Sequence, residues 1–161
     1  MVYKDCDEMC GRACPDYSSC PEMTDPPPSS EGSTFYVYVA NRLSGNPGEY
    51  LANVREMSAA CRCLMDMGFC PINPAGDILE GLVSPEPLPV TAFQRRSMGL
   101  LRLLAHALGT SDRVALFVVH DGHRNGRRSE GVHAEICEAK RLGIPVAFSI
   151  EELCAGRGSE P

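Results

Sequence analysis

Apolar residues along this chain fall into short continuous runs that alternate with longer, periodic stretches. The runs are rich in β-branched and aromatic side chains and predict strands at 35–40 (FYVYVA), 69–74 (FCPINP), 113–119 (RVALFVV) and 144–150 (IPVAFSI). The run at 113–119 is apolar nearly throughout. This is typical of a strand buried on both faces at the centre of a parallel sheet.

The periodic stretches predict helices, because their apolar residues recur at helical spacing. The first runs from Tyr50 to Met67, and Gly68 fits its end. The second covers about 93–108, the third about 131–142, and a short final element starts at Glu151. The inward-facing residues of the second helix are Met98, Leu101, Leu104, Ala105 and Leu108.

Strands that alternate with helices at this spacing predict an α/β fold. We expect three layers, a parallel sheet of about four to five strands with helices on both faces, in a Rossmann-like or flavodoxin-like arrangement. In such sheets the ligand binds beyond the carboxyl ends of the strands. The polar loops at 41–48, 75–92 and 120–131 are therefore the candidate binding segments.

The folded domain is expected to begin after a distinct N-terminal segment. Residues 21–34 (PEMTDPPPSSEGST) have the composition of a linker. Residues 1–34 contain seven acids and two bases, a net charge of -5, while the remainder contains fourteen acids and thirteen bases, a net charge of -1. We expect a poorly ordered acidic tail and linker over 1–34, one domain over 35–154 and a flexible C-terminus over 155–161.

Charge and hydropathy exclude several classes of function. The net charge of -6 argues against a nucleic-acid polymer as partner. The longest apolar runs are far shorter than the roughly 20 residues of a membrane span, so no membrane partner is expected. The first residues, MVYKDCDEMC, carry acids where a secretion signal has an apolar segment, and this predicts a cytoplasmic protein.

Nine cysteines divide into two sets. Four near the N-terminus, spaced C-x3-C-x3-C-x5-C, could hold zinc tetrahedrally but lack the usual C-x2-C knuckle. Metal binding there and a metal-free tail both stay open for Cys6, Cys10, Cys14 and Cys20. The others are expected to be small core residues in a reducing compartment: Cys61, Cys63, Cys70, Cys137 and Cys154.

The chemistry-bearing residues cluster where the third predicted helix begins. Ser129 and Gly131 lie at its start, where free N–H groups and the helix dipole attract an anion such as phosphate. Glu135 follows one turn later, a separation that suits a 5′-phosphate at one end of a ligand and a sugar C1′ at the other. The same loop adds cationic side chains at Arg124, Arg127 and Arg128.

The sequence from Ser129 to Val146 follows the pattern S-x-G-x-x-x-E-x-x-x-A-x-x-x-G-I-P-V. It resembles the nucleoside 2-deoxyribosyltransferase-like superfamily, and within it the 2′-deoxynucleoside 5′-phosphate N-hydrolases, which carry Ser-x-Gly-x-Gly-x-Glu at this place. A second resemblance lies at 35–45 (FYVYVANRLSG) and 68–74 (GFCPINP). A group of uncharacterised, phage-associated domains shares this text. Together the matches span about 35–150.

The resemblance implies chemistry at an N-glycosidic bond. Glu135 would attack C1′ as the nucleophile, and Ser129 with Gly131 would bind the 5′-phosphate. The sugar and base pocket would be lined by Tyr38 or Tyr36 from the first strand and by Asn41, Ser44 and Gly45 from its loop. No cofactor is expected and no metal at this site. A homodimer or higher homo-oligomer is expected, because superfamily members assemble in this way.

Two positions depart from the hydrolase pattern. The hydrolases place an acid before the central strand to protonate the leaving base, and residues 100–112 offer only Asp112, which marks the strand start. Asp121 and Asp77 are the nearest substitutes, and we predict Asp121 as the second catalytic residue with Asp77 in the binding site. His133 stands where the pattern has a small glycine.

Three hypotheses of function follow. The first is an enzyme that hydrolyses or transfers the base of a (deoxy)nucleoside 5′-monophosphate, with a nucleotide or nucleoside as partner. The second is a non-catalytic nucleotide-binding or sensing module with the same fold and a decayed acid, which would bind a nucleotide without releasing its base. The third is an interaction protein that works through its Cys-rich tail.

Overall fold

The computed structural model describes residues 34–43, 45–77, 86, 88–108, 113–119 and 129–156. The chain divides into two units, Met1–Gly32 and Ser33–Pro161, and every described residue belongs to the second. The predicted tail over 1–34 therefore lies outside the described residues, except for Thr34. The four N-terminal cysteines lie outside them as well.

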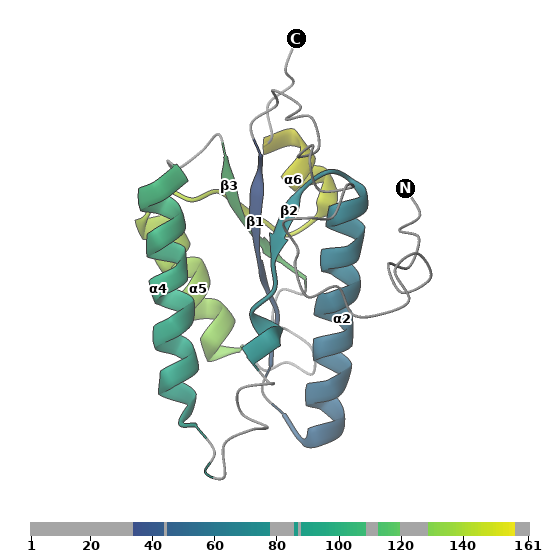
Figure 1. The fold of residues 1–161 in the computed structure, drawn as a ribbon, viewed down its shortest axis with the longest axis vertical. Coiled ribbons are helices and arrows are strands. Elements are labelled where there is room, and N and C mark those ends of the chain that lie inside the picture. Colours follow the sequence, from purple (N-terminus) through teal and green to yellow (C-terminus); the bar gives the residue numbers. More distant parts are fainter. Residues whose placement is uncertain are drawn as a thin grey trace, which may run out of the picture. The chain divides into compact units, whose positions relative to one another are not determined.

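A four-stranded parallel sheet forms the middle layer of this unit (Figure 1). Its strands are β1 (Tyr36–Ala40), β2 (Cys70–Ile72), β3 (Val114–Val118) and β4 (Val146–Ala147), in the spatial order β2-β1-β3-β4. β1 pairs with β2 on one side and with β3 on the other. The predicted α/β class with a parallel sheet is confirmed.

Helices cover both faces of the sheet, which gives the three predicted layers. α2 (Pro47–Asp66) and α6 (Ile150–Gly156) pack on one face, and α4 (Val90–Leu108) and α5 (Glu130–Arg141) pack on the other (Figure 1). A short 3-10 helix, η3 (Pro74–Asp77), follows β2.

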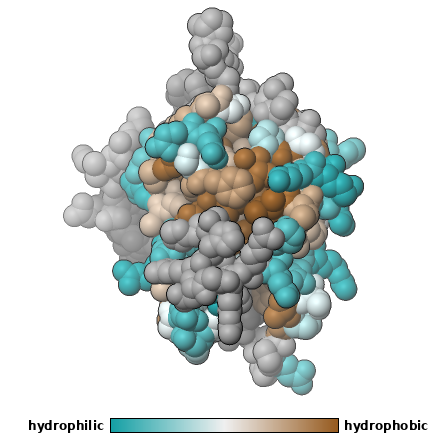
Figure 2. All heavy atoms as spheres, turned by 180° about the vertical axis from the view of Figure 1, so that it is seen from behind, coloured by the Kyte–Doolittle hydropathy of each residue, from teal (hydrophilic) through white to brown (hydrophobic). Residues whose placement is uncertain are grey.

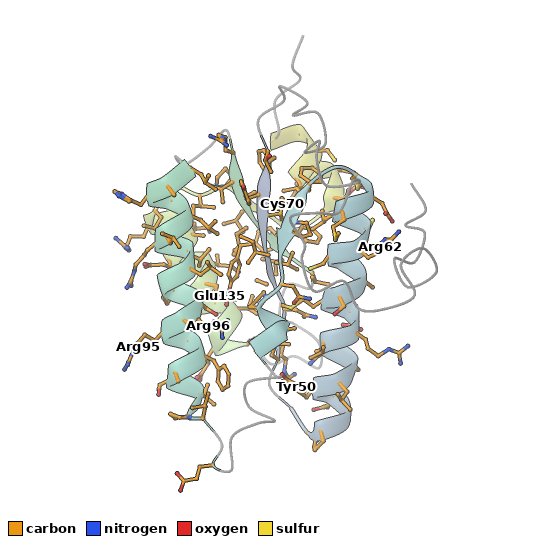
Figure 3. The ribbon with its side chains drawn as sticks, viewed as in Figure 1. Tyr50, Arg62, Cys70, Arg95, Arg96 and Glu135 are labelled. Atoms are coloured by element: carbon orange, nitrogen blue, oxygen red, sulfur yellow. The ribbon has the colours of Figure 1, made fainter. Side chains whose placement is uncertain are left out.

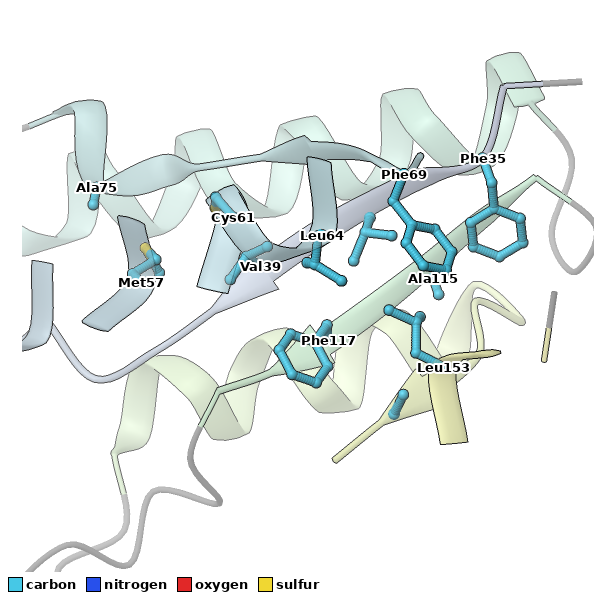
Figure 4. Close-up of a cluster of buried hydrophobic side chains, with 12 residues drawn as sticks. Phe35, Val39, Met57, Cys61, Leu64, Phe69, Ala75, Ala115, Phe117 and Leu153 are labelled. Atoms are coloured by element: carbon cyan, nitrogen blue, oxygen red, sulfur yellow. The ribbon is translucent and has the colours of Figure 1, made fainter. Parts of the chain in front are cut away.

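β1 divides its side chains between the two faces because successive residues of a strand point to opposite sides. Phe35, Val37 and Val39 enter the core beneath α2 and α6 (Figure 4). In that core the rings of Phe35 and Phe69 meet edge to face, with centroids 5.7 Å apart. Tyr38 and Ala40 enter the opposite core together with residues of α4 and α5: Leu101, Leu104, Val132 and Ala139.

α2 begins at Pro47, three residues earlier than predicted. Asn46 is the cause: its side chain accepts a hydrogen bond from the Glu49 N–H at 3.0 Å, and the Glu49 carboxylate accepts one from the Asn46 N–H at 3.1 Å. This reciprocal capping box, with proline in the first turn, starts the helix inside the predicted loop 41–48.

Replacing Asn46 with Ala is therefore expected to lower the free energy of unfolding by about 1 kcal/mol, since it removes the acceptor for the Glu49 N–H. Urea unfolding would measure the change. Asn46→Asp keeps an acceptor at this position and is expected to retain most of the stability. Equal losses in both variants would contradict a capping role.

Other element boundaries also differ from the predictions. α4 starts at Val90, within the predicted loop 75–92. β4 has two residues instead of the predicted seven, because the chain turns after Ala147 into α6. The side chain of Ser149 accepts from the Glu152 N–H at 3.1 Å and so stabilises the start of α6, which extends to Gly156, beyond the predicted domain end.

The prediction that the five cysteines outside the tail are core residues is wrong for three of them. Cys61 is buried, and burial raises the pKa of its thiol to about 11. Cys70 is half-buried, whereas Cys63, Cys137 and Cys154 are exposed. All five are free thiols.

Some large apolar side chains remain on the surface. Val90 is 71% exposed and Phe148, just after the edge strand β4, is 48% exposed. Figure 2 shows an apolar area in the middle of one face, bordered by hydrophilic side chains. Among the described helices, none combines the length and the apolar character that crossing a bilayer requires.

Candidate functional site

The sheet order creates one place where connections leave in opposite directions. From β1 the chain crosses to β2, and from β3 it crosses to β4 on the other side. The carboxyl ends of β1 and β3 therefore lie side by side, and their following segments diverge. Ligands of doubly wound sheets bind at this kind of switch point. At this edge Asn41 follows β1 and Val119 follows β3, and the Val119 N–H donates to the Ala40 carbonyl oxygen at 3.0 Å.

Glu135 of α5 lies against β1 near this edge, on the face of the sheet that α4 and α5 cover (Figure 3). The Tyr38 hydroxyl donates a hydrogen bond to Glu135 Oε1 at 2.8 Å. Tyr38 is completely buried and Glu135 is half-buried. Two predicted site residues, 97 positions apart in the sequence, are thus in direct contact.

The surroundings of Glu135 shift its ionisation towards neutral pH. Burial removes water from the carboxylate and raises its pKa to about 6. Hydrogen bonds from Tyr38 and from Ser97 of α4 act in the opposite direction, because they stabilise the charged form. At pH 7 the group is therefore mostly ionised, yet it takes up a proton just below neutrality.

An ion-pair network joins the two helices that hold this carboxylate. Arg102 of α4 contacts Glu138 of α5 at 2.6 Å, and Arg141 contacts the same carboxylate at 2.8 Å. Together the two guanidinium groups hold the pKa of Glu138 at about 2. α4 and α5 also pack against each other, which fixes Ser97 beside Glu135.

Ser129 and Gly131 lie at the start of α5, as predicted. Ser129 is the N-cap residue, and its hydroxyl oxygen accepts from the Val132 N–H at 3.4 Å. The hydroxyl hydrogen remains available to an acceptor. Ser129 and Glu135 are six positions apart in the sequence, which corresponds to about 9 Å along the helix axis.

Asn41 and Gly45 follow β1 and have structural roles in the fold. Asn41 is buried, and its amide donates to the Asn53 carbonyl oxygen at 3.1 Å, which ties the end of β1 to α2. Gly45 is exposed and has φ of +152°, and a Cβ there would lie 2.6 Å from the Glu49 carboxylate. The polypeptide therefore needs glycine at this position for the capping box to form.

Several predicted residues fall outside the described part of the chain. They are Ser44, Asp121, Asp112 and the three arginines at 124, 127 and 128. Asp77 lies in η3, after β2 and so at the same edge of the sheet, but its side chain is not described. Tyr36, the alternative to Tyr38, is half-buried on the same face of β1.

Ser97 is the contact of Glu135 that the sequence analysis missed. It occupies the position four residues before Leu101, on the buried stripe of α4 that continues to Leu104. A hydroxyl on an otherwise apolar stripe was a detectable signal, because buried polar groups require a partner.

Replacing Ser97 with Ala is expected to raise the pKa of Glu135 further, because one hydrogen bond to the ionised carboxylate is lost. The pH dependence of thermal unfolding would show the shift as a transition displaced to higher pH. Ser97→Thr keeps the hydroxyl and should restore the original transition. A curve for Ser97→Ala that superimposes on the original would contradict the contact.

In the described ranges, no group of three or more His, Cys, Asp or Glu side chains is arranged to hold a metal ion. What the described residues do bring together is a buried tyrosine, a serine and a carboxylate of raised pKa, at the switch point of a doubly wound sheet. Comparison of the chain with protein-family models, with curated proteins and with solved structures found no match.

Proposed function

We propose that this protein cleaves or transfers the base of a (deoxy)nucleoside 5′-monophosphate, with Glu135 as the nucleophile. The observation that carries the proposal is the contact between Tyr38 and Glu135, which fixes a partly desolvated carboxylate at the sheet's switch point. The type of reaction is taken from the resemblance of the surrounding sequence to the nucleoside 2-deoxyribosyltransferase-like superfamily.

The pKa of Glu135 suits this role. A nucleophile must be ionised, and a pKa of about 6 leaves roughly nine-tenths of the carboxylate charged at pH 7. Removal of water from the carboxylate makes it more reactive towards an electron-poor carbon. The Tyr38 hydroxyl holds Oε1, so the carboxylate has a defined orientation before substrate arrives.

The reaction would proceed in two displacements. A Glu135 oxygen forms a bond to C1′ while the bond from C1′ to the base nitrogen breaks, and the base leaves with that electron pair and a proton from a general acid. Asp121 is the proposed acid. Water then attacks C1′, passes a proton to the deprotonated Asp121 and releases the Glu135 carboxylate, giving the free sugar phosphate. A second base in place of water would give transfer.

The start of α5 is the proposed anchor for the 5′-phosphate. The Ser129 oxygen accepts from the Val132 N–H, so its hydroxyl hydrogen can be donated to a phosphate, and the first-turn N–H groups carry partial positive charge. The axial separation of about 9 Å from Ser129 to Glu135 leaves room for a ribose phosphate between them. Asn41, Ser44, Gly45 and Asp77 would border the sugar and base from the neighbouring strand ends.

Base release tests the proposal. The full chain would be incubated with a panel of deoxyribonucleoside and ribonucleoside monophosphates, and free base measured by chromatography. Release that disappears in Glu135→Ala supports glycosidic chemistry. If a nucleotide raises the melting temperature but no base is released, the protein is a non-catalytic nucleotide-binding module and not an enzyme. Neither effect with any nucleotide would overturn the proposed function.

A further inference from the structure

α5 carries a second pair of chemically active side chains, on the surface and separate from Glu135. His133 and Cys137 are one turn apart, and both are exposed. The Cys137 Sγ lies 3.7 Å from the His133 Nε2. Residues at i and i+4 of a helix share one face, so the backbone itself holds these two donor atoms together.

The separation of the two atoms matches what a tetrahedral zinc ion requires. Zinc binds thiolate sulfur at about 2.3 Å and imidazole nitrogen at about 2.0–2.1 Å. At a tetrahedral angle, those bond lengths place sulfur and nitrogen about 3.6 Å apart. The observed 3.7 Å is close to this separation, so the two donor atoms are already spaced to bind one ion.

The donor types also select the metal. Thiolate and imidazole together favour zinc and its neighbours over magnesium or calcium, which prefer oxygen. Both side chains are accessible, so an ion can enter from solvent. The pair supplies two ligands, which leaves two tetrahedral positions for water or for an outside donor.

We propose that His133 and Cys137 form a two-ligand site for a divalent metal of the zinc class on the exposed face of α5. On binding, the thiol proton passes to solvent and the thiolate bonds to the metal, while the imidazole binds through Nε2 with its hydrogen on Nδ1. The chelate spans the helical turn that contains Glu135. The proposal is independent of the proposed function, since it requires no nucleotide.

Metal protection of individual thiols tests the site. The reduced full chain would be treated with limiting iodoacetamide with and without zinc, and alkylation of each cysteine followed by peptide mass mapping. Zinc is expected to slow alkylation of Cys137 several-fold, since bound thiolate is no longer a free nucleophile. Cys63 and Cys154, which are also exposed, are the internal controls and should change little.

The variant His133→Gln removes the nitrogen ligand and keeps Cys137. Protection of Cys137 should then fall to the level of Cys63 and Cys154. Equal slowing of all three thiols in the original chain, or unchanged protection of Cys137 in His133→Gln, would overturn the site.

Thermal unfolding gives a second, independent readout. Zinc should raise the melting temperature of the original chain more than that of Cys137→Ser, because a ligand that binds only the folded helix stabilises it. Cys154→Ser is the matched control and should respond as the original chain does. Equal zinc shifts in all three proteins would count against the site.

Discussion

Replacing Glu135 with Gln is expected to lower base release by about three orders of magnitude or more while the chain stays folded. The amide is nearly isosteric and can still accept the hydrogen bond from Tyr38, but it cannot form a bond to C1′. Chromatographic rates with the best monophosphate would measure the loss. Activity within about tenfold of the original would exclude Glu135 as the nucleophile.

The same substitution should make the protein more stable at neutral pH. The folded-state pKa of Glu135 is about 6, against an ordinary value of 4.5, so the folded chain holds this proton more tightly than the unfolded chain. Stability is therefore lost as the pH rises from about 4.5 to 6. Above that window the ionised carboxylate costs about 2 kcal/mol, which Glu135→Gln would recover.

Urea unfolding of both proteins between pH 4 and pH 8 would separate this effect from others. Glu138 has a lowered pKa, so its ion pairs contribute stability above about pH 4.5 that is lost towards pH 2, equally in both proteins. The difference between the two curves isolates Glu135. Glu151→Gln, an exposed change of the same kind on α6, should not reproduce the gain at neutral pH.

Replacing Tyr38 with Phe is expected to lower kcat about 10- to 100-fold, the equivalent of one hydrogen bond to a charged group. The phenol hydroxyl no longer orients Glu135 Oε1, although the ring still fills the core. Because that hydroxyl stabilises the ionised carboxylate, its removal raises the pKa of Glu135 above about 6. The acidic limb of the kcat/KM profile should therefore move to higher pH.

Tyr36→Phe is the matched control for this variant. Tyr36 lies two residues earlier on the same face of β1 and is half-buried. Removing the Tyr36 hydroxyl should leave the acidic limb of the kcat/KM profile at its original pH. A profile that shifts equally in both variants would show a general effect on the core instead of a specific contact with Glu135.

The sequence was sufficient to predict the layers of the fold, because periodicity reports burial directly. The run at 113–119 forms the inner strand β3, and the stripe from Met98 to Leu108 forms the buried side of α4. The start of α2 was missed because Asn46 and Glu49 act as a reciprocal pair, which periodicity does not register. β4 was overestimated because Phe148 and Ser149 leave the sheet for the turn into α6.

The candidate site was predictable only where the relevant residues lie in one segment. Glu135 was predicted from the sequence pattern of its own helix. Tyr38 was predicted as one of two candidate tyrosines in the first strand. Ser97 comes from a third element, and its meeting with Glu135 depends on how α4 packs against α5. The contact between His133 and Cys137 is local, yet it was missed because cysteine was assumed to be a core residue.

The alternation of β1 has a consequence for how errors in folding would be expressed. Val37 and Val39 face one core and Tyr38 the other, so a slip of the strand by one residue would exchange every side chain between the faces. Such a slip would bury the phenol hydroxyl away from Glu135 and break both cores together. The register that packs both cores is therefore also the register that places the Tyr38 hydroxyl beside Glu135, so correct folding of β1 and assembly of the site depend on the same alignment.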